Sequence, residues 1–328
     1  MIPAIDSVTP RDFSRGFLPA QDPLLHLPAP FEPWEEVGQW LPKLLLSENI
    51  RPIMRGLPPF PLEAIETEPQ KWRAMTLLAY LTSGYVLGYE HTPAKVRPAH
   101  LAVPLVTMAD ELGIPPILSY ALQTMYNWRR IIDAGPTAVG NLGLIQNFLG
   151  GMDEEWFVTI HVNIEAEAGR ALRVLEPLHT AGDKHDIPLA EHCLHEIAAT
   201  LTTLRHLLSR MVERCDPYIY YHRVRPFMFG WKDNPDLPGG LIYEGVEKFG
   251  GQPQAFRGET GAQSGIIPAI DAALGIQHER DAMRIYLNEM RDYMPPADRA
   301  FVAALEAGPS VRAWVMREKA AHPSLREA

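Results

Sequence analysis

The segment of the chain with the most distinctive chemistry runs from Tyr218 to Trp231 and has the sequence YIYYHRVRPFMFGW. Aromatic residues alternate there with basic ones, and Pro226 ends any helix directly after Arg225. An arginine among aromatic rings can bind a carboxylate through two hydrogen bonds while the rings hold a flat apolar body. The same pattern also suits an aromatic core cluster whose arginine head groups reach solvent. Both interpretations stay open on the residues alone.

A second segment, RGETGAQSGIIP at 257–268, combines small residues with hydroxyl and amide side chains. Small residues let the backbone approach a ligand closely, and Thr260, Gln263 and Ser264 can donate hydrogen bonds to it. The segment is not a phosphate-binding loop, because the lysine of the GxxxxGK[ST] motif is missing. A flexible linker is the alternative interpretation.

His161 falls on the apolar stripe of a predicted helix, four residues after Phe157 and three before Ile164. A histidine on such a stripe is either a hydrogen-bonded core residue or a residue of a functional site.

Three further histidines, His185, His192 and His195, lie close together, and the last two are three residues apart on one helical face. They could in principle share a metal ion. That face is opposite the apolar stripe that begins at Leu194, so we expect it to be solvated. The chain has no HExxH, GxSxG or CxxC motif, which leaves hydrolase and zinc-ribbon functions without support.

The elements that must position these residues are predicted to be helices almost throughout, after a proline-rich opening. No run alternates as a strand beyond a few residues, so the predicted fold is mostly α. The stretches 134–152 and 226–265 are glycine-rich and predicted to be irregular. The apolar stripe of the long helix 189–214 consists of Leu194, Ile197, Leu201, Leu204, Leu208 and Met211. The predicted helices cover 71–89, 117–133, 153–176, 189–214, 266–274, 281–291, 297–306 and 310–319.

Composition limits the class of protein. The 328 residues are 46% hydrophobic and 21% charged, which excludes a disordered or fibrous chain. A net charge of −10 argues against nucleic-acid binding. Two cysteines, no visible signal peptide and no apolar run of the ~20 residues that a membrane span needs predict a cytoplasmic protein that binds no membrane. The oligomeric state is not predicted.

Five blocks of the chain together resemble the indoleamine 2,3-dioxygenase family of haem enzymes. The resemblance extends from about residue 12 to the end of the chain, and the order of the blocks makes it specific. The blocks are RGFLPAQDPL at 15–24, PPILSYALQTMYNW at 115–128, RPFMFGWKDNPDLPGGLIYEGV at 225–246, FRGETGAQSGIIPAIDAALGIQ at 256–277, and MRDYMPPADRAFVAALEAGPSVR at 290–312.

The resemblance implies a two-domain helical fold, with a smaller domain at 1–150 and a larger haem and substrate domain at 151–328. It implies haem b as the cofactor, O2 as the co-substrate, and L-tryptophan or a related indole as the substrate. Both oxygen atoms would be inserted across the indole C2–C3 bond to give an N-formylkynurenine-type product. The alternatives are another tryptophan-modifying reaction on the same fold and a haem-free indole-binding protein.

The resemblance also assigns roles to residues. Arg225 matches the arginine that pairs with the substrate carboxylate, and Thr260 matches a hydroxyl residue that lies over the haem and can bond the substrate ammonium group. The remaining substrate-binding positions are Tyr120, Phe157, Tyr220, Tyr221 and Met228, and the haem-binding positions of the glycine loop are Gly258, Gly261 and Ala262.

Two features depart from the family pattern. His161 stands where the mammalian indoleamine enzymes have a serine, and an imidazole there could hydrogen-bond the indole N–H or the bound oxygen, as a catalytic residue alongside Arg225 and Thr260. The family's proximal histidine is expected some twenty residues beyond the LREA motif, which here ends at Ala328. The iron ligand is therefore not assigned.

Overall fold

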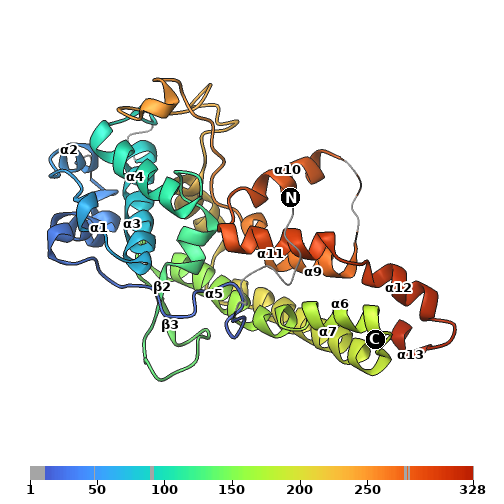
Figure 1. Cartoon of the computed structure of the whole chain (residues 1–328). Helices are drawn as coiled ribbons and strands as arrows, with labels where there is room; N and C mark the ends of the chain where they lie inside the picture. The colour runs from blue at the N-terminus through green and yellow to red at the C-terminus, as the bar shows by residue number, and fades with distance from the viewer. Residues whose placement is uncertain (1–11, 48, 89–91, 277–278, 280, 328) are drawn as a thin grey trace. The chain divides into compact units, whose positions relative to one another are not determined.

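The computed structural model describes residues 12–47, 49–88, 92–276, 279 and 281–327 (Figure 1). The helices are α1 (Glu32–Leu44), α2 (Ile50–Arg55), α3 (Glu68–Leu87), α4 (Ala99–Leu112), α5 (Met152–Leu172), α6 (Leu175–Lys184), α7 (Ile187–Ser209), α8 (Pro217–Ile219), α9 (Ile266–Leu274), α10 (Ala282–Arg291), α11 (Pro296–Ala307), α12 (Val311–Glu318) and α13 (Ser324–Glu327). The strands are β1 (Val96–Arg97), β2 (Trp128–Arg130), β3 (Leu142–Leu144) and β4 (Ile242–Tyr243).

The mostly α prediction is confirmed, and most predicted helices match observed ones within a few residues. The prediction of one helix over 117–133 is wrong. The chain forms a short π-helix, Ala121–Met125, and then enters β2. The Asn127 side chain accounts for the change of direction. Its amide donates to the Gln146 carbonyl and its oxygen accepts from the Gln146 N–H, at 2.9 and 2.7 Å, which fixes the chain beside β3.

The described chain divides into two compact units, each built from several segments. Unit A consists of residues 21–159 and 211–261, and unit B consists of residues 12–20, 160–210 and 262–327. The division boundary falls within α5. The two-domain division near residue 150 stays a prediction.

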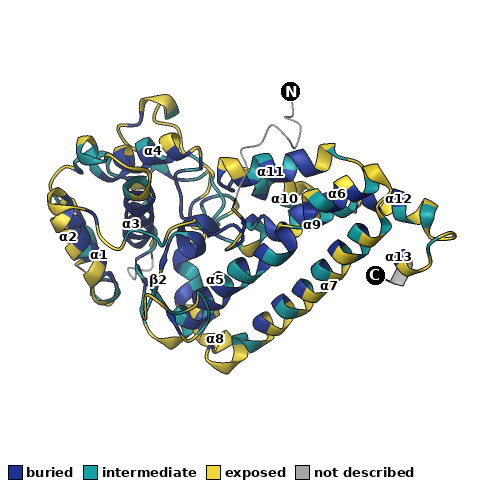
Figure 2. Ribbon diagram, turned by 60° about the horizontal axis from the view of Figure 1, so that its bottom comes forward, coloured by how far each residue is buried: buried dark blue, intermediate teal, exposed yellow. Residues whose placement is uncertain are grey.

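Unit A is built around α3. Thr67 and Gln70 form a reciprocal capping box that fixes the start of this helix. Residues 72–86 are all buried, so α3 is covered along its length (Figure 2). A helix that is apolar all round is stable only inside a core, and α1 and α4 pack against it. Of two small strand pairs, the parallel pair of β1 with β4 joins segments far apart in the sequence, and the antiparallel pair of β2 with β3 joins neighbouring ones.

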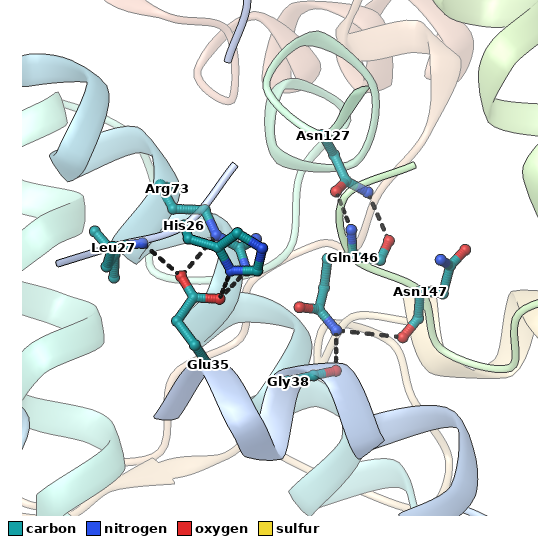
Figure 3. Close-up of polar contacts among 8 residues, drawn as sticks. All are labelled: His26, Leu27, Glu35, Gly38, Arg73, Asn127, Gln146 and Asn147. Carbon is teal, nitrogen blue, oxygen red and sulfur yellow. Dashed lines mark hydrogen bonds and ion pairs between the residues drawn. The ribbon is translucent and has the colours of Figure 1, made fainter. Parts of the chain in front are cut away.

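Two polar anchors hold α1 in unit A (Figure 3). The Glu35 carboxylate accepts from the Arg73 guanidinium through both oxygens and from the Leu27 N–H at 2.9 Å. Both charged side chains are buried, so each supplies the counter-charge of the other where water cannot. Three residues further along the helix, the Gln146 amide donates to the Gly38 carbonyl at 2.7 Å.

Unit B packs α6 against α7 and α9 against α11. Gly16 has a φ of +61°, and a Cβ at this position would lie 1.9 Å from the Glu165 carbonyl oxygen. The close approach of these two backbones therefore requires glycine. None of the described helices is both long and apolar enough to cross a membrane.

Candidate active site

The predicted aromatic and arginine segment lies in unit A as a chain of irregular helical turns. Asp216 caps α8 by accepting from the N–H groups of Tyr218 and Ile219 at 2.8 and 3.1 Å. The chain continues as a π-helix, Tyr220–Val224, and as a 3-10 helix, Arg225–Met228. Pro226 has no N–H to give, so a regular α-helix cannot continue through it. Wide π-turns of this kind are frequent at functional sites because they redirect side chains.

The structure brings three of the predicted substrate-binding residues together. The rings of Phe157 and Tyr220 are stacked, with their centroids 3.9 Å apart and their planes at 21°. The Tyr220 hydroxyl donates to the Met228 sulfur at 3.4 Å. Tyr220 and Met228 are buried and Phe157 is half-buried. Two stacked rings and a thioether form a surface suited to a flat aromatic ligand.

A second ring stack supports the same segment from α3. Tyr80 stacks on Phe148 at 4.4 Å, and Phe148 stacks on Phe227 at 5.2 Å. Tyr120 is also buried, directly before the π-helix Ala121–Met125.

The glycine loop is attached to this segment through its backbone. The Glu259 N–H donates to the Met228 carbonyl at 3.2 Å. A Cβ at Gly258 would lie 2.0 Å from that same carbonyl oxygen, so only glycine fits there. The loop is therefore an anchored part of unit A up to Gly261, which contradicts the alternative interpretation of a flexible linker for these residues.

Glu259 is a site residue that the sequence analysis did not identify. Its side chain is 7% exposed. With its amide nitrogen turned towards the loop, Gln123 donates to both carboxylate oxygens, at 3.0 and 3.2 Å. Burial raises the pKa of Glu259 to about 7, and the positive charge of Arg225 opposes that shift. The one signal in the sequence was a charged residue inside a run of small uncharged ones.

Arg225 is half-buried, and its charge acts on Glu259 and Tyr220. Its positive charge opposes the rise in the pKa of both Glu259 and Tyr220. For Tyr220 the larger effects are burial and the charge of Glu259, which raise the pKa of the phenol well above its usual range. An arginine, a buried carboxyl group and an aromatic surface thus share one neighbourhood.

The other predicted site residues lie as follows. Tyr221 is 59% exposed, with its ring edge-on to that of His222 at 5.1 Å. Thr260 is half-buried and follows Glu259 directly. His161, half-buried on α5, and Ala262 both belong to unit B. The roles of these four residues stay predictions.

The loop offers one place where a flat cofactor could approach the backbone. A Cβ at Gly261 would meet no atom within 4 Å, so this exposed glycine borders open space, whereas Gly258 is closed off by Met228. This arrangement fits a planar group lying on the loop.

Metal ligation is not visible among the described residues. No three or more of their His, Cys, Asp and Glu side chains gather as a metal site. His192 and His195 are exposed on α7, and His185 ends α6 in the left-handed conformation.

A pocket of about 470 Å³ lies beside the same segment but contains none of the predicted site residues. Its walls are Leu87, Gly88, Thr92, Pro93, Pro226, Phe229, Gly230, Lys232, Asp233, Asn234, Pro235 and Asp236.

Comparison with known proteins decides the family. The family model described as indoleamine 2,3-dioxygenase matches residues 11–328. The chain belongs to the indoleamine 2,3-dioxygenase family. It is 35% identical over 309 residues to indoleamine 2,3-dioxygenase 1 of Rattus norvegicus, which covers 93% of this chain and 75% of that protein.

Other members are similarly related. Indoleamine 2,3-dioxygenase 2 of Homo sapiens is 32% identical over 92% of this chain and 73% of its own length. A 6-hydroxytryptophan 2,3-dioxygenase of Fusarium equiseti is 31% identical over 92% of this chain and 74% of its own length. Members of the family are haem dioxygenases that act on tryptophan or other indoles, so this chain is an oxidoreductase.

Proposed function

We propose that this family member inserts both atoms of O2 across the C2–C3 bond of L-tryptophan and gives an N-formylkynurenine-type product. The observation that carries the proposal is the stacked pair Phe157 and Tyr220, closed by Met228 and lying in the reach of the Arg225 charge. An indole fits against the rings, and its side-chain carboxylate fits a guanidinium.

The residues of this chain position the substrate. Arg225 binds the carboxylate, the rings of Tyr120, Phe157 and Tyr220 hold the indole, and Thr260 bonds the ammonium group. Holding a reactant in one orientation removes much of the entropy cost of the reaction. His161 is the proposed hydrogen-bonding group next to the indole N–H.

We propose haem b as the cofactor, held along the loop at Gly258, Gly261 and Ala262. The open space at Gly261 supports this placement. When bound, haem supplies the binding and activation of O2. The contribution of the chain is to orient the indole.

The test is a single-turnover reaction of the haem-reconstituted protein with L-tryptophan and O2 labelled with heavy oxygen. We expect a product with the mass of N-formylkynurenine and two labelled atoms. Tryptophan consumption that gives a product with one label or none would support another tryptophan-modifying reaction instead. Binding of tryptophan without turnover would support an indole-binding protein.

A further inference from the structure

The ionised Glu259 carboxylate would repel the carboxylate of an indole bound in the site, and we call this a charge conflict. The group is buried beside the arginine that is proposed to bind the substrate carboxylate. A second carboxylate bound there would lie near the first, in surroundings where charges interact more strongly than in water. A buried acid that only repelled the ligand would be a costly feature, which suggests that it recognises another part of the ligand.

The groups that interact with Glu259, by a hydrogen bond or by charge, come from four elements of unit A. Gln123 of the π-helix Ala121–Met125 donates to its carboxylate. Arg225, at the start of the 3-10 helix, is the positive charge. The negative charge of Glu259 raises the pKa of Tyr220, on the π-helix Tyr220–Val224, and that of Tyr80, on α3. The charge of Glu154 on α5 acts on both tyrosines in the same direction.

These surroundings leave Glu259 able to accept another donor. An ionised carboxylate has about four acceptor positions, and Gln123 supplies one donating group to it. The neighbouring tyrosines have raised pKa values and stay neutral phenols, so they add no charge of their own. Among the groups that interact with Glu259, the positive charge is that of Arg225.

We propose that Glu259, together with the adjacent Thr260, receives the α-ammonium group of the substrate and is a specificity-determining residue, so that Arg225 and Glu259 recognise an amino-acid zwitterion. This inference rests on the proposed function and names the charge pattern that the site selects. The ammonium and carboxylate of an α-amino acid are attached to one carbon atom. A ligand whose carboxylate lies on Arg225 therefore carries its ammonium group into the same neighbourhood.

Three indoles that carry different charged groups on the side chain separate the possibilities. L-tryptophan has both charges, tryptamine has the ammonium alone, and indole-3-propionate has the carboxylate alone. Their affinities are to be measured by calorimetry on the haem-reconstituted chain, for the wild type and for Glu259→Gln. We expect the variant to bind L-tryptophan and tryptamine about tenfold or more weakly, because it loses a charge-assisted hydrogen bond. Indole-3-propionate should bind at least as well as to the wild type.

Glu154→Gln is the matched control, since it removes the other buried carboxyl group with a pKa raised to about 7. It should change the affinities of all three indoles by one common factor. If Glu259→Gln also behaves in that way, Glu259 is only structural and the inference is wrong. If Glu259→Gln weakens the binding of L-tryptophan and indole-3-propionate and leaves that of tryptamine unchanged, Glu259 positions Arg225 and does not bind the ammonium group. The inference is then wrong as well.

The wild-type protein gives a second test that needs no variant. Because the pKa of Glu259 is about 7, its negative charge develops between about pH 6 and about pH 8. An alkyl amine like that of lysine stays protonated over this range. Tryptamine should therefore bind more tightly as the pH rises, and indole-3-propionate more weakly. Affinities of the two that change in parallel would overturn the inference.

The failure of the two proposals can be told apart. If the wild type forms the doubly labelled product and the three indoles respond identically to Glu259→Gln, only the inference fails. If the wild type binds none of the three indoles, the proposed function fails and the inference fails with it.

Discussion

Two carboxyl groups of unit A, Glu154 and Glu259, are buried and have pKa values raised to about 7 by burial, yet their surroundings differ. Glu154 accepts from three successive backbone N–H groups, those of Phe148, Leu149 and Gly150, at 2.8 to 2.9 Å. Its role is to hold the turn before α5. Glu259 faces side chains instead, and side chains can change partners when a ligand binds.

Arg225 is expected to be the residue on which carboxylate binding depends most. Arg225→Ala should raise the KM for L-tryptophan about 10- to 100-fold, because a charge-assisted pair with the substrate is lost. Tryptamine, which has no carboxylate, should be affected much less. Steady-state kinetics with both substrates measure this difference.

The matched control is Arg223→Ala, which removes an exposed arginine two residues earlier. It should leave both KM values unchanged. An unchanged KM for L-tryptophan in Arg225→Ala would remove Arg225 from the site.

At this scale the sequence predicted the residues whose types are unusual and missed the ones that depend on a distant partner. The family resemblance assigns substrate-binding roles to Phe157, Tyr220 and Met228, and these residues do lie together. Glu259 was missed because its role depends on Gln123, which lies more than a hundred positions earlier in the chain. No local pattern connects these two residues.

At the scale of elements, helical periodicity predicted where helices lie better than which side of them is buried. On α7 the predicted stripe included Leu208, which is exposed, while Cys193 and Thr200 are buried. The helix is amphipathic, but its buried face is rotated from the one that hydropathy alone selects. A small cysteine and a threonine that bonds the preceding turn can face a packed neighbour where the bulkier leucine does not.

The pair of Glu35 and Arg73 is expected to be the most sensitive polar contact between α1 and α3. Glu35→Gln would leave the buried guanidinium without its counter-charge. The free energy of unfolding should fall by about 3 to 5 kcal/mol, as is typical when one partner of a buried ion pair is removed. Urea denaturation measures the loss.

Glu111→Gln serves as the control, because Glu111 pairs with Lys71 at 2.7 Å while both side chains are partly exposed. Exposed pairs contribute roughly 0 to 1 kcal/mol. Equal, small losses in the two variants would contradict the view that the Glu35 pair fixes α1 on α3.

At the scale of the whole molecule, composition and periodicity were enough for the fold class, since a chain with helical periodicity and no alternating runs has few other solutions. They were not enough for the way in which segments combine. Unit A joins residues 21–159 to 211–261, and β1 pairs with β4 across that gap. Strands of two residues leave no alternation to detect.

The two buried acids also affect the stability of the protein as a function of pH. An unfolded glutamate has its ordinary pKa of 4.5, so between that value and about 7 the folded protein binds more protons than the unfolded one. The contribution of each glutamate to the free energy of unfolding is complete below the pKa that the group has in the unfolded protein. It is lost as the pH rises through the pKa of the group in the folded protein. The loss amounts to about 3 kcal/mol for each group.

Glu259→Gln replaces the acid with a side chain that stays neutral, and it isolates this effect. The free energy of unfolding of the wild type should fall relative to that of the variant as the pH rises from about 5 to about 8, because only the wild type must ionise a buried group. Denaturation of both proteins in urea at each pH gives the difference. Glu247→Gln, at an exposed position, should leave the difference from wild type constant. A constant difference for Glu259→Gln as well would mean that Glu259 is hydrated or paired strongly enough to ionise without cost, and the charge conflict that makes it a recognition group would not exist.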